Sequence, residues 1–334
     1  MKHINIALFV VHKGCPHMCS FCNQRSISGS QREITPDEVR SAAETAIASL
    51  SANEAAGGEI AFFGGSFTMI ERGYMISLLE AAYEYVKNGV FKGIRISTRP
   101  DGISEEICSI LRDYGVSAVE LGAQSLDDRV LELNDRGHTA KQVEEAVSML
   151  KSFGFETGLQ MMTGLYGSED SDSIATAEKI IAMHPDTVRI YPTVVIKGTK
   201  LHELMLSGEF APKGIEETVD LCAGLIPMFE DAGIKIIRVG LHSGGDVEAE
   251  YAGGAYHPAL RELCEGRIYY NIALGKLRGY DCGSYTLAVN KKEISKMTGQ
   301  KKQNLIRLQS LGYECFIEGH DNMAKYEIAV EYRG

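Results

Sequence analysis

The sequence lacks the features of membrane, secreted and broadly nucleic-acid-binding proteins. No uninterrupted apolar segment approaches the roughly 20 residues that span a bilayer. The N-terminal stretch MKHINIALFVVHKG has a short apolar run without a small-residue cleavage site, so we expect a strand there and not a signal peptide. Acidic residues outnumber basic ones by 45 to 34, for a formal net charge of −11. This excess disfavours binding to nucleic acid or anionic membranes except through a local basic surface. We therefore expect a cytoplasmic globular protein without membrane association.

Cysteine is sparse outside one short segment. Three of the eight cysteines fall within residues 12–24, HKGCPHMCSFCNQ, and they are Cys15, Cys19 and Cys22. A disulfide would use only two of these thiols, and a reducing cytoplasm favours metal binding or thiol chemistry. The segment, called the cysteine loop below, is therefore a candidate metal centre.

Two kinds of metal centre fit three clustered cysteines. A structural zinc ion takes four ligands, and His12 or His17 could supply the fourth. An iron–sulfur cubane usually takes four cysteines, so three would leave its fourth iron open as a reaction site.

The chain alternates short β-rich apolar runs with longer amphipathic stretches. The predicted strands are Ile4–Val11, Glu59–Phe63, Gly93–Ser97, Ala118–Gly122, Glu156–Met162, Thr187–Tyr191 and Lys235–Val239. Helix starts are readable at Thr35 and Thr139, where each threonine is followed three residues later by a capping-box Glu or Gln. Alternation of this kind indicates a parallel sheet with helical crossovers. We predict an α/β fold, an incomplete (β/α) barrel of about six or seven parallel units, with a small C-terminal α+β unit.

A polar or glycine-rich cluster follows each of the first six predicted strands. In order these are the cysteine loop, GGSFT, TRPD, AQS, GLYG and YPT. The carboxyl ends of barrel strands meet at one mouth, where barrel enzymes carry out their chemistry. The clusters therefore predict one composite site, the alternative being that they are ordinary turn residues.

The spacing C-x3-C-x2-C, with Phe21 directly before the last cysteine, resembles the signature of radical S-adenosylmethionine (SAM) enzymes. The resemblance implies that Cys15, Cys19 and Cys22 ligate a [4Fe–4S] cluster whose open iron chelates SAM. It also implies that one electron, delivered by a reducing partner such as flavodoxin or ferredoxin, cleaves SAM to methionine and a 5′-deoxyadenosyl radical. The protein would then bind and aim the cofactor and exclude solvent.

Two further motifs match the cofactor-binding positions of that superfamily. Gly64 and Gly65 in FFGGSFT lie where its glycine motif supports the methionine amino group, and Ser66 adds a hydroxyl. Gln124 in LGAQS and Arg136 in RGHT resemble the coproporphyrinogen-oxidase-like branch, which implies ribose and carboxylate contacts respectively.

Gln160, in LQMMTGLYG, matches the position of a second ribose contact in the same branch. For Arg136 the alternative to a cofactor contact is that it is a surface arginine at the end of a helix.

Residues 5–240 resemble the radical domain of the Elongator catalytic-subunit family. The shared segments, in order, are STRPD, VELGAQS, RGHT and RIYPTVVIKGTKLHEL. Members of that family modify the wobble uridine of transfer RNA and carry an acetyltransferase domain that uses acetyl-CoA. Here no matching acetyltransferase segment follows, so acetyl-CoA is not an expected substrate. The cysteine loop is also shorter than in that family, and Tyr166 replaces its usual proline.

Arg99 in TRPD and Tyr191 in YPT lie at the predicted mouth, and we expect them to contact substrate or steer the radical. The alternatives are that Arg99 binds a backbone carbonyl or Asp101 and that Tyr191 packs in the core.

We predict three regions: 1–240 is the radical SAM core barrel, 241–284 an irregular closing extension, and 285–334 a small basic α+β unit. The last region has two helical stretches followed by the strands YECFIE and KYEIAVEY. Its residues 291–307 contain a single acid, Glu293, and six basic residues: Lys291, Lys292, Lys296, Lys301, Lys302 and Arg307. These could dock an RNA phosphate backbone, or form a solvated helix face.

The combined expectation is a radical SAM enzyme that modifies transfer RNA or another RNA. Two alternatives stay open at the sequence level. One is a radical SAM enzyme acting on a small, tetrapyrrole-like molecule, and the other is a zinc-bound RNA adaptor without catalysis.

Overall fold

The computed structural model describes residues 4–10, 15–16, 18–23, 33–241 and 247–333. The chain forms two compact units. The barrel unit comprises Met1–Lys213 and Met228–Ala255, and the C-terminal unit comprises Gly214–Pro227 and Tyr256–Gly334. This grouping differs from the predicted regions, because most of the segment 241–284 belongs with the C-terminal elements.

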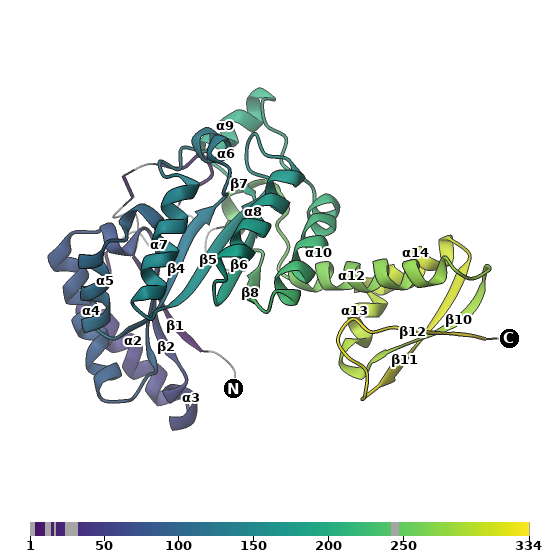
Figure 1. The fold of residues 1–334 in the computed structure, drawn as a ribbon, viewed down its shortest axis with the longest axis horizontal. Coiled ribbons are helices and arrows are strands. Elements are labelled where there is room, and N and C mark those ends of the chain that lie inside the picture. Colours follow the sequence, from purple (N-terminus) through teal and green to yellow (C-terminus); the bar gives the residue numbers. More distant parts are fainter. Residues whose placement is uncertain (1–3, 11–14, 17, 24–32, 242–246, 334) are drawn as a thin grey trace. The chain divides into compact units, whose positions relative to one another are not determined.

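Seven parallel strands form the sheet of the barrel unit (Figure 1). They are β1 Asn5–Val10, β2 Glu59–Gly64, β3 Gly93–Thr98, β4 Val116–Gln124, β5 Glu156–Thr163, β6 Thr187–Pro192 and β8 Lys235–Val239. Their spatial order is β1-β2-β3-β4-β5-β6-β8, and every neighbouring pair is parallel. Because β1 and β8 are the two edges and do not pair, the barrel is open. The predicted incomplete barrel is confirmed.

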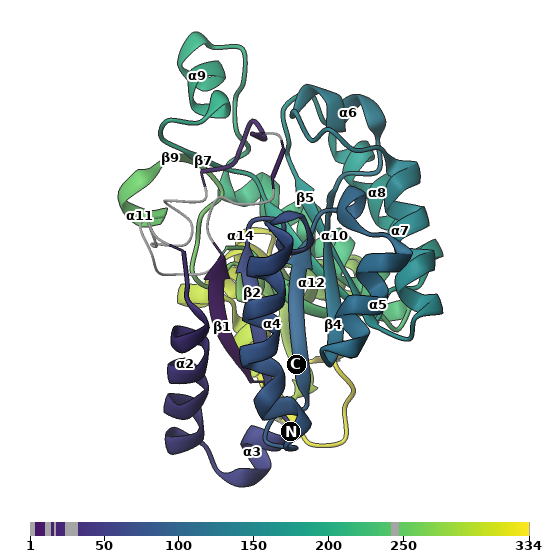
Figure 2. The same cartoon turned by 90° about the vertical axis from the view of Figure 1, so that its left-hand side faces the viewer.

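Helices join successive strands, and the longer ones cover one face of this sheet (Figures 1 and 2). They are α2 Pro36–Ser49, α3 Ala52–Ala56, α4 Arg72–Lys87, α5 Glu105–Asp113, α6 Asp128–Leu133, α7 Ala140–Ser152 and α8 Asp170–Met183. The predicted capping boxes are present at α2 and α7. Thr35 accepts from the backbone N–H of Glu38, and Thr139 accepts from that of Gln142. Each satisfies a backbone donor that a helix start leaves without an intrahelical partner.

The two faces of the sheet differ in chemistry. Side chains alternate between the faces of a strand, so Ile94 and Ile96 face the helices while Arg95 faces the inside of the barrel. The same alternation on β4 places Val119 and Leu121 outside and Glu120 inside. All of these side chains are buried. The outer face is therefore an apolar core and the inner face a charged one.

The remaining elements of the barrel unit flank the carboxyl end of β6. β7 Val194–Ile196 pairs antiparallel with β9 Tyr251–Gly254. Helices α9 Lys200–Ser207, α10 Ile215–Asp231 and α11 Val247–Glu250 complete this part, although α10 is divided between the two units at Pro227.

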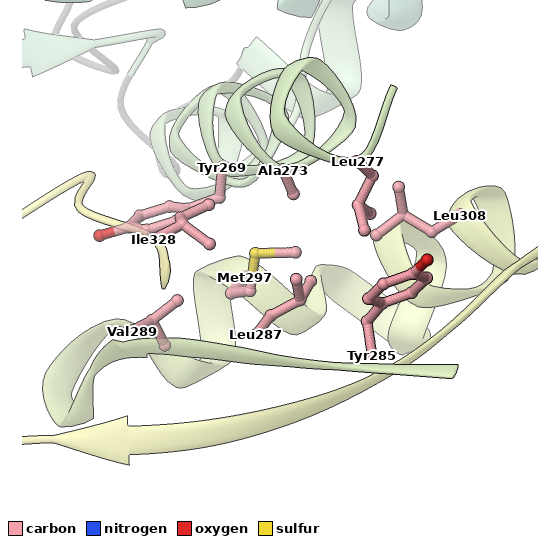
Figure 3. Close-up of a cluster of buried hydrophobic side chains, with 9 residues drawn as sticks. All are labelled: Tyr269, Ala273, Leu277, Tyr285, Leu287, Val289, Met297, Leu308 and Ile328. Atoms are coloured by element: carbon pink, nitrogen blue, oxygen red, sulfur yellow. The ribbon is translucent and has the colours of Figure 1, made fainter. Parts of the chain in front are cut away.

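The C-terminal unit is a small α+β structure, as predicted. Its elements are α12 Leu260–Leu277, β10 Gly283–Asn290, α13 Ile294–Thr298, α14 Gln303–Ser310, β11 Tyr313–His320 and β12 Ala329–Tyr332. β10 lies centrally, parallel to β11 and antiparallel to β12. Figure 3 shows one face of β10 packed under α12 through Leu287, Met297 and Ala273. The segment 241–284 contains the 18-residue helix α12, and its role as a closing extension stays a prediction.

Within the described residues, no helix is both long and apolar enough to cross a membrane.

Candidate functional site

The cysteine loop follows β1, and segments distant in the sequence fasten it. The structure describes its residues 15–16 and 18–23. Ser20 donates from its backbone N–H to the Asn134 carbonyl (3.1 Å) and from its hydroxyl to Asn134 Oδ1 (2.7 Å). The amide of Asn134 donates to the Tyr166 carbonyl (2.9 Å), and the Leu201 N–H donates to the Ser20 carbonyl (2.9 Å). The end of α6 and the first turn of α9 therefore hold the loop directly, and the segment after β5 holds Asn134 in place.

Arg136 is a buried residue of this site and not a surface arginine. Its Nη1 donates to Cys19 Sγ at 3.1 Å, and its Nη2 donates to the Gly122 carbonyl at 2.6 Å. Its guanidinium carbon lies 5.9 Å from the ring centre of Phe21. Phe21 also packs against the apolar cluster of Val195, Leu201 and Phe210, which anchors the ring. The phenylalanine before Cys22 thus braces both the loop and the arginine.

Cys15 lies among the same groups. Desolvation raises the pKa of its thiol above 9.0, and the nearby Cys19 raises this pKa further. Arg99, Arg136 and the backbone N–H of Ser66 act in the opposite direction. The backbone N–H of Cys22 donates to the Cys19 carbonyl at 3.1 Å, which closes a turn between these two cysteines.

The glycine pair after β2 lies against the end of β1. Gly64 has φ +106°, and a Cβ there would lie 2.8 Å from the Val10 carbonyl oxygen. The Gly65 N–H donates to that same carbonyl at 2.9 Å. Only glycine permits this approach of the backbone to the end of β1.

Ser66 points its hydroxyl into the protein. The hydroxyl hydrogen-bonds Thr98 Oγ1 (2.9 Å) and accepts from the backbone N–H of Arg99 (3.1 Å). It therefore positions the end of β3, and its cofactor contact stays a prediction.

Gln124 and Arg136 come together over Gly122. Gln124 has φ +65°, and the pairing register of β4 with β5 shifts between Gly122 and Gln124. A Cβ at Gly122 would lie 2.8 Å from Gln124 Nε2 and 3.4 Å from Arg136 Nη2. The strand irregularity re-aims Gln124 toward the arginine, which is a common use of such irregularities beside functional sites.

Three buried polar atoms in the described part of this site have no hydrogen-bond partner: Arg99 Nη1, Arg136 Nε and His138 Nδ1. The other guanidinium nitrogens of Arg99 bind Asp101 at 2.9 and 3.0 Å, as the alternative interpretation of this residue held. Unsatisfied buried donors and acceptors are costly, so these three atoms indicate a polar ligand. Two arginines beside cysteines fit the carboxylate of a bound amino-acid cofactor.

Sequence reasoning missed His138. Burial, then the neighbouring Arg136 and Arg99, lower its pKa to about 4, so the ring is neutral near pH 7. Its Nε2 lies 3.3 Å from the Ala123 carbonyl, which assigns the proton to Nε2 and leaves Nδ1 as an acceptor. The only signal in the sequence was its place two residues after Arg136.

More polar side chains of the candidate site lie on the inner face of the sheet, below the mouth of the barrel. Arg189 forms a bidentate pair with Glu120 at 2.6 and 2.8 Å and reaches the Tyr191 hydroxyl at 3.4 Å. Gln160 donates from Nε2 to Glu120 at 2.9 Å and to Ser97 at 3.4 Å. Gln160 therefore presents its remaining amide atom, Oε1, for a ligand.

Tyr191 is only partly covered, which differs from a fully packed core aromatic. Desolvation raises the pKa of its hydroxyl, whereas Arg189 lowers it. Sequence reasoning missed Glu120 and Arg189, although a charged residue inside an apolar strand was the available signal.

A further ionic layer lies beneath these residues. Arg95 binds Glu59 and Glu156 at 2.7 Å each and approaches Glu120 at 3.5 Å. The three acids lie on β2, β4 and β5, whereas Arg95 lies on β3. The inner face is therefore a connected set of paired charges from the base of the barrel toward its mouth.

Among the described residues, no three His, Cys, Asp or Glu side chains converge on a single metal ion. A [4Fe–4S] cluster does not need such convergence, because each cysteine binds a different iron. The donor set of three cysteines with adjacent arginines fits that cluster and a carboxylate-bearing cofactor. His12 and His17, the suggested fourth zinc ligands, lie outside the described residues.

Comparison with known proteins places the chain in a family. The model of the radical SAM superfamily matches residues 9–180, and that of the Radical_SAM C-terminal domain matches residues 185–270.

Curated relatives include human Elongator complex protein 3 and a tRNA uridine(34) acetyltransferase from Methanocaldococcus infernus. The human protein is 30% identical over 262 residues, which cover 75% of this chain and 45% of that protein. The M. infernus protein is 36% identical over 129 residues, which cover 38% of this chain and 24% of that protein. The chain thus spans less than half the length of either relative.

Among solved structures, M. infernus Elp3 lacking its N-terminal residues superposes with a TM-score of 0.65 at 21% identity. The match covers 84% of this chain and 66% of that chain and shows a shared fold. The resemblance seen in the sequence motifs is confirmed, and this chain belongs to the radical SAM superfamily of enzymes.

Proposed function

We propose that this chain binds a [4Fe–4S] cluster through Cys15, Cys19 and Cys22 and uses it to cleave SAM in order to modify RNA. When bound and reduced, the cluster supplies the electron that converts SAM into methionine and a 5′-deoxyadenosyl radical. The observation that carries this proposal is the convergence of Cys15 and Cys19 with Arg99 and Arg136 at the carboxyl ends of the strands.

The residues around the cysteines have separate roles in this proposal. Arg136 holds the cofactor carboxylate with its unpartnered Nε, and Arg99 adds charge and an N–H donor through Nη1. The neutral ring of His138 accepts a hydrogen bond at Nδ1, which suits an amino or hydroxyl group of the cofactor. Gln124 and Gln160 offer amide atoms to the ribose, and the Gly64–Gly65 backbone leaves space for the amino group.

The inner face below these groups is where we place the substrate. Tyr191 keeps its hydroxyl proton at neutral pH because its pKa is raised. A protonated hydroxyl beside Arg189 can donate to a carbonyl or phosphate oxygen of the substrate.

RNA, with transfer RNA foremost, is the substrate class that we propose. Two observations support it: the transfer-RNA activity in the name of the M. infernus relative, and the lysines of the C-terminal unit. A small redox protein of the flavodoxin or ferredoxin kind would deliver the electron.

The six basic residues of 291–307 differ in how far the protein already pairs their charges. Lys296 binds Glu265 and Glu293 at 2.8 Å each, and Arg307 binds Glu216 at 2.7 Å, so these two stabilise the fold. Lys291 lies 3.9 Å from Asp321. The other three, Lys292, Lys301 and Lys302, are exposed and form no ion pair within the described part of the chain. Contact with an RNA backbone would therefore centre on these three lysines.

The test of the radical chemistry is anaerobic. The cluster is reconstituted, dithionite and SAM are added, and 5′-deoxyadenosine is quantified for the wild type and for Cys22→Ala. We expect product from the wild type alone, with SAM binding weakened in Arg136→Met at unchanged iron content. A purified protein that held one zinc ion and no iron would contradict the proposal.

RNA binding is tested with the double variant K301E/K302E and total transfer RNA. We expect weaker binding and a shallower dependence of log affinity on log salt, by about 0.7 to 0.9 per lost phosphate contact. The matched control is Lys235→Glu, an exposed lysine of the barrel unit. Equal loss in both variants would show a general charge effect and not a binding surface.

A further inference from the structure

A cavity of about 480 Å³ opens at one end of the C-terminal unit, where residues 278–282 connect α12 to β10. The side chains that line it and matter here are Arg278, Tyr280, Asp281, Cys282, Tyr285 and Tyr332. We call it the tyrosine pocket. No role of the barrel unit involves these residues, and they lie outside the basic stretch 291–307.

Tyr285 is the rigid floor of the tyrosine pocket. It is 2% exposed, and Figure 3 shows it at one end of the apolar cluster beside Leu277 and Leu308. Its hydroxyl donates to the Asp281 carbonyl at 2.6 Å, which fixes the ring and the connection together.

Two exposed tyrosine rings pack against Tyr285. Tyr332 pairs directly with Tyr285 across β12 and β10, with ring centres 5.6 Å apart at 64°. Tyr280 lies 5.6 Å from Tyr285 at 59°. Yet Tyr332 is 68% exposed and Tyr280 49% exposed.

Gly283 leaves room for the ring of Tyr332. A Cβ at Gly283 would lie 3.3 Å from Tyr332 Cε2, so a larger residue would push against the ring. The pocket therefore displays two aromatic rings to solvent without using them for its own core.

The chemistry of the lining selects a flat ligand with a polar edge. Exposed tyrosine rings offer stacking surface, which accepts any nucleobase because every base has a π-face. The carboxylate of Asp281 can accept from an exocyclic amino group, as acidic side chains do with cytosine. Arg278 lies at the rim, where its guanidinium can bind an adjoining phosphate.

We propose that the tyrosine pocket binds an unpaired nucleobase of RNA, stacked on Tyr280 and Tyr332. This inference rests on the proposed RNA function and adds a base contact to it, at a place distinct from Lys301 and Lys302.

The first test uses the full-length, cluster-loaded protein and fluorescein-labelled heptanucleotides of A, C and U, with binding followed by anisotropy. Tyr280→Ala and Tyr332→Ala should each weaken binding by about 5- to 150-fold, the factor that one stacked base carries. Tyr280→Phe and Tyr332→Phe should bind as the wild type, because stacking needs the ring and not the hydroxyl. Tyr251→Ala, an exposed tyrosine of the barrel unit, is the control and should have no effect.

The second test uses Cys282 as a reporter in the unmodified chain. Its exposed thiol lines the pocket, whereas Cys315 lies on β11 and is half-buried. Saturating heptanucleotide should slow alkylation of Cys282 by iodoacetamide, measured by peptide mass spectrometry, and leave the rate at Cys315 unchanged. This readout does not depend on how the alanine variants fold.

The outcomes separate this inference from the function on which it rests. Alanine variants that bind RNA like the wild type, with Cys282 still reactive, would overturn the pocket and leave an RNA function intact. A wild-type protein that binds none of the heptanucleotides and no transfer RNA would overturn both. Production of 5′-deoxyadenosine is measured separately and does not depend on the pocket.

Discussion

The two units of this chain bury different kinds of side chain at their centres. The inner face of the barrel holds paired charges such as Glu120 with Arg189. The C-terminal unit closes around Leu287, Val289 and Met297, which are apolar and completely buried. A buried ion pair is weak evidence for stability, because apolar residues of equal volume often stabilise a protein as well or better. The charged centre therefore marks the unit that handles a polar ligand, and the apolar centre marks the unit whose interior only supports its surface.

This comparison predicts that the barrel is most sensitive to an unpaired charge. Glu120→Ala leaves Arg189 buried without its carboxylate, which should cost about 3 to 5 kcal/mol of unfolding free energy. Hydrogen exchange followed by mass spectrometry should speed up in β3 to β6 and stay unchanged in β10 and β11. The exposed pair of Arg40 with Glu84 provides the control, and Arg40→Ala should change little. If hydrogen exchange in the barrel strands of Glu120→Ala matched that of the wild type, the buried charges would not be what distinguishes the barrel unit from the C-terminal unit.

The C-terminal unit should instead be sensitive to a cavity. Leu287→Ala removes a completely buried side chain of β10 and should cost about 2 to 5 kcal/mol. Faster exchange should be confined to β10, β11 and the helices that pack on them. A matched substitution at Leu311, which is 48% exposed, should have a small effect. If exchange rose equally in the barrel unit, the two units would not respond separately.

A third, smaller effect concerns pH and belongs to the barrel unit alone. The pKa of His138 is about 4 in the folded chain and about 6.5 when unfolded. Between these values the unfolded chain binds the extra proton, so stability is unaffected above pH 6.5 and falls as the pH decreases toward 4. The loss is at most about 3 kcal/mol. Urea unfolding of the metal-free protein at pH 7.5 and 5.0 should show a smaller drop for His138→Asn than for the wild type. Equal drops would show that other groups carry the pH dependence.

Local pattern was sufficient to predict the seven parallel strands. Each buried strand is a short apolar run between turn residues. The observed strands differ from the predicted ones only in their bounds; for example, β4 continues to Gln124 beyond the predicted Gly122. That extension depends on a left-handed residue and a register shift, which arise from contact with β5. Strands β7 and β9 were missed because each is very short and pairs with a distant segment.

The candidate site, like the fold, contains residues that local motifs could predict and residues that depend on distant contacts. Motif spacing predicted the cysteines, Gln124 and Arg136, because those residues follow strands whose carboxyl ends meet. It could not predict Asn134 as the anchor of the cysteine loop, since that role depends on a contact 114 residues away in the sequence. Nor could it show that Lys296 and Arg307 are neutralised, because their acidic partners Glu265 and Glu216 lie in other helices.

The anchoring of the cysteine loop has a consequence for how the protein is made. Cys15, Cys19 and Cys22 are synthesised early, but the loop is fastened by Asn134, Tyr166 and Leu201. A ribosome that adds about 5 to 20 residues per second needs roughly 10 to 40 s to pass from Cys22 to Leu201. Throughout that interval the three thiols lack the segments that hold them and are open to oxidation. We therefore expect the proposed cluster to be loaded late, after Leu201 has been made, because a shorter chain lacks one of the contacts that hold the loop.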